Sequence, residues 1–182
     1  LGLHSLQSDY FQPYQFITHM FMHGGFLHIF SNMFALWMFG SRLEMTWGPS
    51  RFLFYYFFTG LGAAVLHSGV TYWEIEQYRQ AGASIMELNR LINIPTVGAS
   101  GAVFGVLIGF GLLFPNTRLM LLFPPIPIKA KVFVFLYGAF ELYAGFNSLS
   151  GGSNIAHFAH VGGMLFGYIL IKYWNKKGSD FY

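Results

Sequence analysis

The sequence predicts an all-α protein, a polytopic bundle of membrane helices that forms one domain over residues 1–182. Of these residues, 54% are hydrophobic and 9% are charged, whereas soluble domains carry about a quarter charged residues. So few charges cannot cover a surface exposed to water, so lipid is the expected solvent for most of the chain. An aromatic content of 20% fits aromatic belts at the two membrane interfaces.

Five apolar segments reach or approach the length of a membrane span, since a core of about 30 Å needs roughly 20 helical residues. These segments are residues 27–47, 52–67, 97–114, 132–149 and 155–174. We therefore expect five spans.

The connecting segments are more polar. Residues 1–26 are expected to form a loop with an interfacial part, and residues 47–50 (Trp-Gly-Pro-Ser) a turn. Residues 71–93 mix charges with apolar residues at helical spacing, which favours an amphipathic helix at the interface. Residues 123–131 are expected to form a proline-rich turn and residues 150–153 a short loop.

The basic residues predict an orientation. Five spans place eight of them on one side of the membrane and two, Arg79 and Arg90, on the other; the eight are Arg42, Arg51, Arg118, Lys129, Lys131, Lys172, Lys176 and Lys177. Short cytoplasmic loops are rich in Lys and Arg. We expect an integral, multi-pass protein of a bacterial plasma membrane, with its C-terminus in the cytoplasm and the starts of the spans bearing Ser100 and His160 at the outer face.

Ser100 and His160 are the candidate nucleophile and base. A serine hydroxyl is a weak nucleophile until a neighbouring base takes its proton, and histidine titrates near neutral pH. A lone serine between glycines is more often a packing residue in a membrane bundle. The spans that hold these two residues contain no aspartate, which favours a dyad over a triad.

Glycines beside both residues predict close helix packing. Gly101 and Gly105 are four residues apart, and so are Gly163 and Gly167, while Gly98 precedes the serine. Small residues at this spacing let membrane helices approach backbone to backbone.

His28 and Asn32 are candidate oxyanion donors. They lie four residues apart and so share one helix face. Side-chain donors aimed at a developing oxyanion contribute about 3 kcal/mol each. The backbone N–H of Ser100, near a helix N-terminus, is a further candidate.

Three motifs together resemble those of the rhomboid family of intramembrane serine proteases. Residues 98–101 match its Gly-x-Ser-Gly motif, residues 159–167 its Ala-His-x-x-Gly-x-x-x-Gly motif, and residues 28–32 its His-x-x-x-Asn motif. Residues 23–26 (His-Gly-Gly-Phe) are also similar to the family, and the resemblance runs from about Pro13 to Trp174.

The resemblance implies a six-helix core that cleaves membrane-anchored substrates in or near their transmembrane segments. This chain lacks the first family helix, so we expect Leu1 to begin a fragment within the first outer loop. The resemblance also implies that Phe104 stacks on the base where some members have tyrosine. The expected partners are transmembrane protein substrates and the lipid bilayer, with no nucleic acid or nucleotide.

The remaining titratable residues are interpreted as structural. We expect His157 to be a solvated interfacial histidine and Glu141 to be a hydrogen-bonded acid that ties two helices together, although an acid in a span is also a functional candidate. His19 and His23 are expected to tether loops. With no cysteine in the chain and no acid near these histidines beyond Asp9, we expect no metal and no other cofactor.

The sequence thus predicts a rhomboid-type serine endopeptidase. One alternative is an inactive rhomboid-like protein that binds transmembrane helices, although inactive relatives typically lack the serine or the histidine. The other is a transporter or channel, which would carry several buried charges along a pathway.

Overall fold

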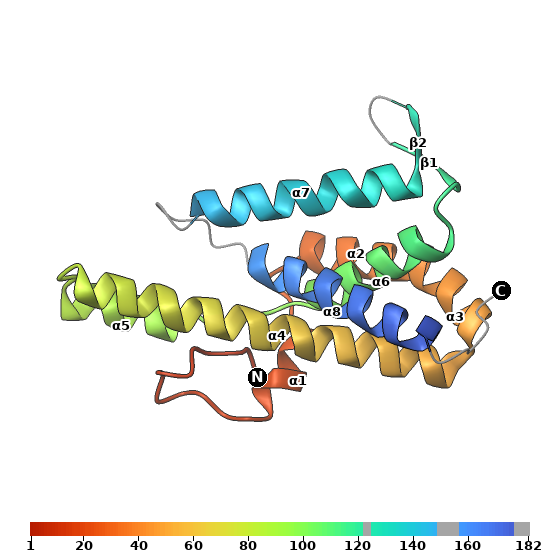
Figure 1. Cartoon of the computed structure of the whole chain (residues 1–182). Coiled ribbons are helices and arrows are strands. Elements are labelled where there is room, and N and C mark those ends of the chain that lie inside the picture. Colours follow the sequence, from red (N-terminus) through yellow and green to blue (C-terminus); the bar gives the residue numbers. More distant parts are fainter. Residues whose placement is uncertain (122–124, 149–156, 177–182) are drawn as a thin grey trace.

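The computed structural model describes residues 1–121, 125–148 and 157–176 (Figure 1). The predicted loop at residues 150–153 lies outside these ranges. The described chain is mostly helical, which confirms the helical part of the predicted fold class. Its helices are α1 (Gln15–Thr18), η1 (His19–Phe21), α2 (Phe26–Ala35), η2 (Leu36–Gly40), α3 (Ser41–Trp47), α4 (Pro49–Gln80), α5 (Ile85–Asn93), α6 (Ser100–Leu113), α7 (Ala130–Ser148) and α8 (His157–Lys176).

The first predicted span is one unbroken helical rod made of α2, η2 and α3, in which η2 is a π-helical stretch. It ends at Gly48, whose φ of +80° is one that side chains rarely adopt. Pro49 then opens α4, in the first-turn position where its missing N–H costs nothing. The turn predicted at residues 47–50 is therefore confirmed.

Helix α4 is much longer than the predicted span at residues 52–67. Its 32 residues extend about 48 Å at 1.5 Å per residue. The expectation of a separate segment beginning at Thr71 is wrong, because the charged residues of this stretch are good helix formers and nothing breaks the helix before Gln80. Beyond Gln80, α5 is the amphipathic helix that the spacing predicted, capped by Ser84 and Glu87.

Among the described residues, α4 is the one helix with the length and apolar composition of a membrane span, and α6 is apolar but has only 14 residues. The count of five spans is therefore not confirmed. The predicted all-α class also omits a small two-stranded sheet. Strands β1 (Arg118–Met120) and β2 (Pro127–Lys129) pair antiparallel, with Arg118 opposite Lys129, where a proline-rich turn was predicted.

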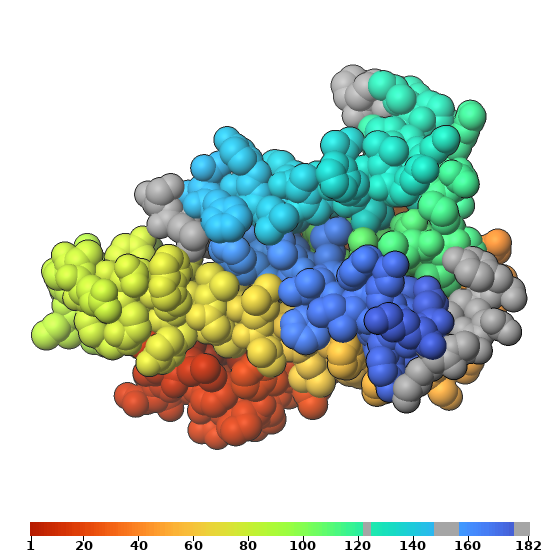
Figure 2. Space-filling view, viewed as in Figure 1, coloured from red at the N-terminus to blue at the C-terminus, as the bar shows by residue number. Residues whose placement is uncertain are grey.

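Helix α6 is the centre of the bundle. It packs against α4 and α8, which also pack against each other. Val106, Leu107 and Phe110 of α6 are buried against Leu43 and Phe52. Helix α7 lies along α8 on the outside of the bundle, and the N-terminal segment lies against the opposite side of α4 (Figures 1 and 2). This arrangement places the first turns of α6 and α8 side by side.

Candidate active site

Ser100 is the first residue of α6, and the segment before it is held on three sides. Thr96 pairs with Leu3 through two backbone hydrogen bonds of 2.8 Å, and its hydroxyl lies 2.7 Å from Nε2 of His67. The Gly98 N–H donates to the His19 carbonyl at 2.9 Å. Gly98 has a φ of +130° and lies against the ring of His28, so a side chain fits neither its backbone nor its surroundings. The start of α6 is thereby fixed in place.

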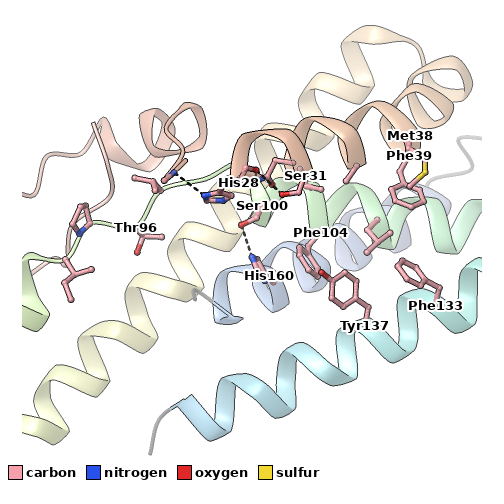
Figure 3. Close-up of a pocket in the computed structure, with 18 residues that line it drawn as sticks. His28, Ser31, Met38, Phe39, Thr96, Ser100, Phe104, Phe133, Tyr137 and His160 are labelled. Carbon is pink, nitrogen blue, oxygen red and sulfur yellow. Dashed lines mark hydrogen bonds between the residues drawn. The ribbon is translucent and has the colours of Figure 1, made fainter. Parts of the chain in front are cut away.

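His160 lies within hydrogen-bond distance of Ser100. Its Nε2 is 2.8 Å from the serine Oγ (Figure 3). The two residues are 60 positions apart in the chain and meet because α6 packs against α8. The structure thus brings together the two residues that the sequence suggested as candidate nucleophile and base.

Glu141 of α7 stands on the other side of the same imidazole. Its Oε2 is 2.9 Å from Nδ1 of His160. A carboxylate oxygen accepts, so Nδ1 carries the proton and Nε2 presents its lone pair to the Ser100 hydroxyl. The dyad expected from the lack of aspartate is thus extended by a glutamate from a third helix.

Glu141 was predicted to tie two helices together, and it does link α7 to α8. Its contact with His160 was missed. Two signals pointed to it: an acid inside an apolar segment, and two histidines three residues apart, which share a helix face.

His157 is not the solvated interfacial histidine that was predicted. It is buried, with 7% of its surface exposed, and its Nδ1 donates to Oε2 of Glu141 at 2.7 Å. The prediction was wrong because it considered depth in the membrane alone. His157 shares a helix face with His160 and so meets the same carboxylate on α7.

The ring of Phe104 stacks on His160, with centroids 4.2 Å apart and planes 7° from parallel. Tyr137 of α7 packs against the same phenylalanine at 5.0 Å. Phe104 is itself buried, so the imidazole is held between an aromatic face and the Glu141 hydrogen bond.

His28 and Asn32 lie on α2 at the edge of the same site. The Gly24 N–H donates to Nδ1 of His28 at 3.2 Å, which leaves Nε2 of that ring as the protonated nitrogen. The Asn32 amide donates one hydrogen to the His28 carbonyl at 2.9 Å and has a second hydrogen to give. Both residues thus keep a side-chain donor on the site.

A cavity of about 650 Å³ joins these groups. Residues 94–97, before Ser100, form part of its wall, and the side chains that line it include His28, Asn32, Ser100, Phe104, Tyr137 and His160. In Figure 3, Ser100 lies between His28 and His160. The arrangement can hold a carbonyl group against Ser100 with hydrogen-bond donors around its oxygen.

Glycines set the distance between α6 and α8. A methyl group on Gly163 would overlap the Gly101 carbonyl oxygen, and one on Gly167 would meet the Tyr55 hydroxyl at 2.5 Å. That hydroxyl donates to the Gly105 carbonyl at 2.7 Å. Gly163 and Gly167 therefore lie where α8 touches the backbone of α6. A methyl group on Gly101 or Gly105 would instead first meet α4, and one on Gly98 would meet His28.

His19 and His23 lie in the N-terminal segment, where the His23 ring packs against that of His28 with centroids 5.1 Å apart. Burial lowers the pKa of His19, whose Nδ1 donates to the Gln15 carbonyl at 2.9 Å. Burial, and then the nearby His28, lower the pKa of His23. Neutral rings suit the tethering role predicted for both.

The model of the Rhomboid domain matches residues 10–176 of the chain. The chain belongs to the rhomboid family. The family assignment drawn from the three motifs is thus confirmed.

Curated rhomboid relatives match most of this chain. It is 34% identical to Rhomboid protein 1, mitochondrial, of Saccharomyces cerevisiae over 94% of its length, and 30% identical to Rhomboid-like protein 11, chloroplastic, of Arabidopsis thaliana over 91%. It is also 30% identical to the mouse Presenilin-associated rhomboid-like protein, mitochondrial, over 86%. It spans 45%, 54% and 37% of these three relatives. No solved structure gives a significant match.

The relatives correct the predicted location. They carry mitochondrial or chloroplastic names. The prediction of a bacterial plasma membrane, with the site at its outer face and the C-terminus in the cytoplasm, is therefore wrong. The distribution of Lys and Arg predicts which loops lie on the same side of a membrane. It does not predict which cellular membrane contains the protein.

Proposed function

We propose that this rhomboid chain is an intramembrane serine endopeptidase that cleaves membrane-anchored proteins within or beside a transmembrane segment. The observation that carries the proposal is the 2.8 Å contact between Ser100 Oγ and His160 Nε2 on the wall of a 650 Å³ cavity. A hydroxyl hydrogen-bonded to an imidazole that a third group orients is the arrangement of an activated nucleophile.

The chemistry follows from the tautomer of His160. Ser100 Oγ attacks the scissile carbonyl carbon while its proton moves to Nε2. The same nitrogen then protonates the leaving amine, and an acyl-enzyme ester remains on Ser100. A water molecule, deprotonated by Nε2, hydrolyses that ester and restores the hydroxyl.

The remaining groups orient His160 and stabilise the charges that form during the reaction. Glu141 accepts the Nδ1–H of His160 at 2.9 Å and stabilises the imidazolium that forms. The Nε2–H of His28, the Asn32 amide and the Ser100 N–H would donate to the oxyanion of the tetrahedral intermediate. Hydrogen-bond donors in a site with little water are worth more than in bulk solvent.

We also propose that the chain spans a membrane. Five spans would be formed by the α2–α3 rod, α4, α6, α7 and α8. The exposed faces of α2 and α7 carry many large apolar side chains, such as Phe30 and Phe135 at 54% and 73% exposure, which suits contact with lipid and with substrate helices. The names of the relatives favour an organellar membrane.

Labelling with a fluorophosphonate tests the function. The full chain, purified in detergent, is incubated with the reagent, and the adduct is located by mass spectrometry. We expect the phosphonyl group on Ser100. Ser100→Ala should give no adduct and no cleavage of a transmembrane substrate. Ser31→Ala, in the same cavity, should keep both. An adduct on another residue, or cleavage by folded Ser100→Ala at the unsubstituted rate, would exclude Ser100 as the nucleophile.

A further inference from the structure

One cluster of side chains contains a histidine that the proposed hydrolysis does not need. Glu141 of α7 receives two imidazoles on the same oxygen, from His157 at 2.7 Å and His160 at 2.9 Å. Their ligand-type atoms all lie within 4.8 Å of one another. One imidazole suffices to activate Ser100, so the second histidine is unexplained by the reaction.

The donor set of this cluster is one that zinc accepts. Two imidazole nitrogens and one carboxylate oxygen form a three-ligand Zn²⁺ set whose fourth position is open to water. Mg²⁺ and Ca²⁺ prefer sites made of oxygen atoms alone. The cluster therefore selects by ligand type for zinc over the common hard cations.

The geometry needs a small adjustment. Ligand atoms about 2.1 Å from a tetrahedral zinc stand roughly 3.4 Å apart, so the contacts of 2.7 and 2.9 Å must open by about 0.5–0.7 Å. The two histidines are three residues apart on the rigid helix α8, and the carboxylate comes from α7. Rotation of the Glu141 side chain opens both contacts, and the two histidine nitrogens, which lie within 4.8 Å of each other, must also adjust to this separation by rotation of their rings.

One residue of the cluster borders the cavity. Glu141 and His157 are buried at 4% and 7% exposure, but His160 lines the cavity of about 650 Å³ that contains Ser100. Of the three residues, His160 is the one that lines this cavity, with its Nε2 toward Ser100 and its Nδ1 toward Glu141. Zinc therefore has to pass the His160 ring to reach the cluster.

We propose that Glu141, His157 and His160 form a zinc-binding site and that zinc bound there switches off the base. Zinc needs the lone pair on Nδ1 of His160, so the proton of the neutral ring relocates from Nδ1 to Nε2. Nε2–H then donates to Ser100 Oγ and cannot accept the serine proton. The binding site stands independently, whereas its effect on activity rests on the proposed function.

A binding experiment tests the site without activity. Calorimetry with zinc chloride uses the full Ser100→Ala chain, purified in detergent with a tag that contains no histidine. We expect saturable binding that Mg²⁺ does not reproduce. His157→Gln and Glu141→Gln should each weaken it at least 10-fold, since even outer partners of metal ligands are worth 10–100-fold. His23→Ala, in the N-terminal segment, is the matched control and should bind as before.

Equal zinc affinity in the parent and in both cluster variants would overturn the site, as would loss of binding in His23→Ala alone. Two different variants, His157→Gln and Glu141→Gln, keep the test informative if one of them fails to fold.

A second experiment tests whether bound zinc lowers the reactivity of Ser100. Zinc should slow fluorophosphonate labelling of Ser100 in the unsubstituted chain, EDTA should restore it, and the labelling that His157→Gln retains should resist zinc. Binding at the cluster with no slowing would overturn the switch. Binding at the cluster in a chain that neither labels nor cleaves would leave the zinc site standing and remove the proposed function.

Discussion

Oε2 of Glu141 lies 2.9 Å from Nδ1 of His160, and the opposite nitrogen of that ring lies 2.8 Å from Ser100 Oγ. The three residues come from three helices, α7, α8 and α6. The carboxylate fixes the tautomer in which Nε2 can accept a proton. Under the proposed function, the activation of Ser100 therefore depends on the packing of α7 against α8.

Replacing Glu141 with glutamine tests this dependence. The amide has nearly the same size, but it can offer its NH₂ group to Nδ1 and so favour the wrong tautomer of His160. We expect kcat to fall at least about 10-fold and by less than the roughly 10⁴-fold seen when a triad aspartate becomes asparagine, because the amide can also rotate to present its oxygen. KM should change little, since Glu141 does not contact the substrate position.

Steady-state cleavage and the melting temperature, measured on one preparation, separate this effect from a structural one. Glu74→Gln, on α4, serves as the matched control. If Glu141→Gln melts several degrees lower and cleaves at the unsubstituted rate, Glu141 ties helices together and does not position His160.

His160 and His157 should differ sharply in their effect on cleavage. His160→Ala should be as damaging as Ser100→Ala, because nucleophile and base act as a unit. His157→Ala should keep most activity, since His157 contacts Glu141 and not Ser100, and the Glu141–His160 hydrogen bond remains. Matched cleavage assays of the two variants check this ranking. A reversed ranking would make His157 the base.

The motifs of the sequence were enough to predict which residues of α2, α6 and α8 meet. Ser100 and His160 each lie beside glycines that let two backbones touch, so spacing along each helix predicted the shared face. The place of Glu141 could not be predicted in the same way. Helix α7 is apolar over most of its circumference, so its pattern does not specify which face turns inward, and the packing of α8 decides it.

Two other differences between the predicted and the observed secondary structure have local causes. The extension of α4 to Gln80 was hidden because Glu74 and Glu76 look like loop residues in a membrane chain. In the structure, Glu76 accepts a hydrogen bond from Gln7 at 2.6 Å and pairs with Arg79, which stabilises the helix beyond its apolar part. The β1–β2 pair was read as a turn because strands of three residues have too little alternation to recognise.

Gly163→Ala should separate α8 from α6. The added methyl group would overlap the Gly101 carbonyl oxygen, which is backbone and cannot turn away. We expect a loss of about 1–3 kcal/mol in stability, as for other overpacked cores. A displacement of about 1 Å between Ser100 and His160 would also lower cleavage roughly 100-fold.

Thermal unfolding and cleavage of the same sample measure both effects. Gly69→Ala, on α4, is the matched control, because a methyl group there meets nothing within 4 Å. An alanine at that position should be neutral or stabilise the helix by about 0.5–1 kcal/mol. Unchanged melting and cleavage in Gly163→Ala would show that the α6–α8 contact is looser than described.

The oxyanion assignment gives the most discriminating prediction. Asn32 has one amide hydrogen left after its bond to the His28 carbonyl, and a donor used only in the transition state affects turnover and not binding. Asn32→Ala should therefore lower kcat by about 10²–10³-fold with little change in KM. His28→Ala should act in the same direction, but it also removes the acceptor for the Gly24 N–H, so Asn32→Ala is the cleaner variant. If both donors serve one oxygen, the double variant should lose less than the product of the single losses. A higher KM with unchanged kcat in Asn32→Ala would assign Asn32 to substrate binding and move the oxyanion site elsewhere in the cavity.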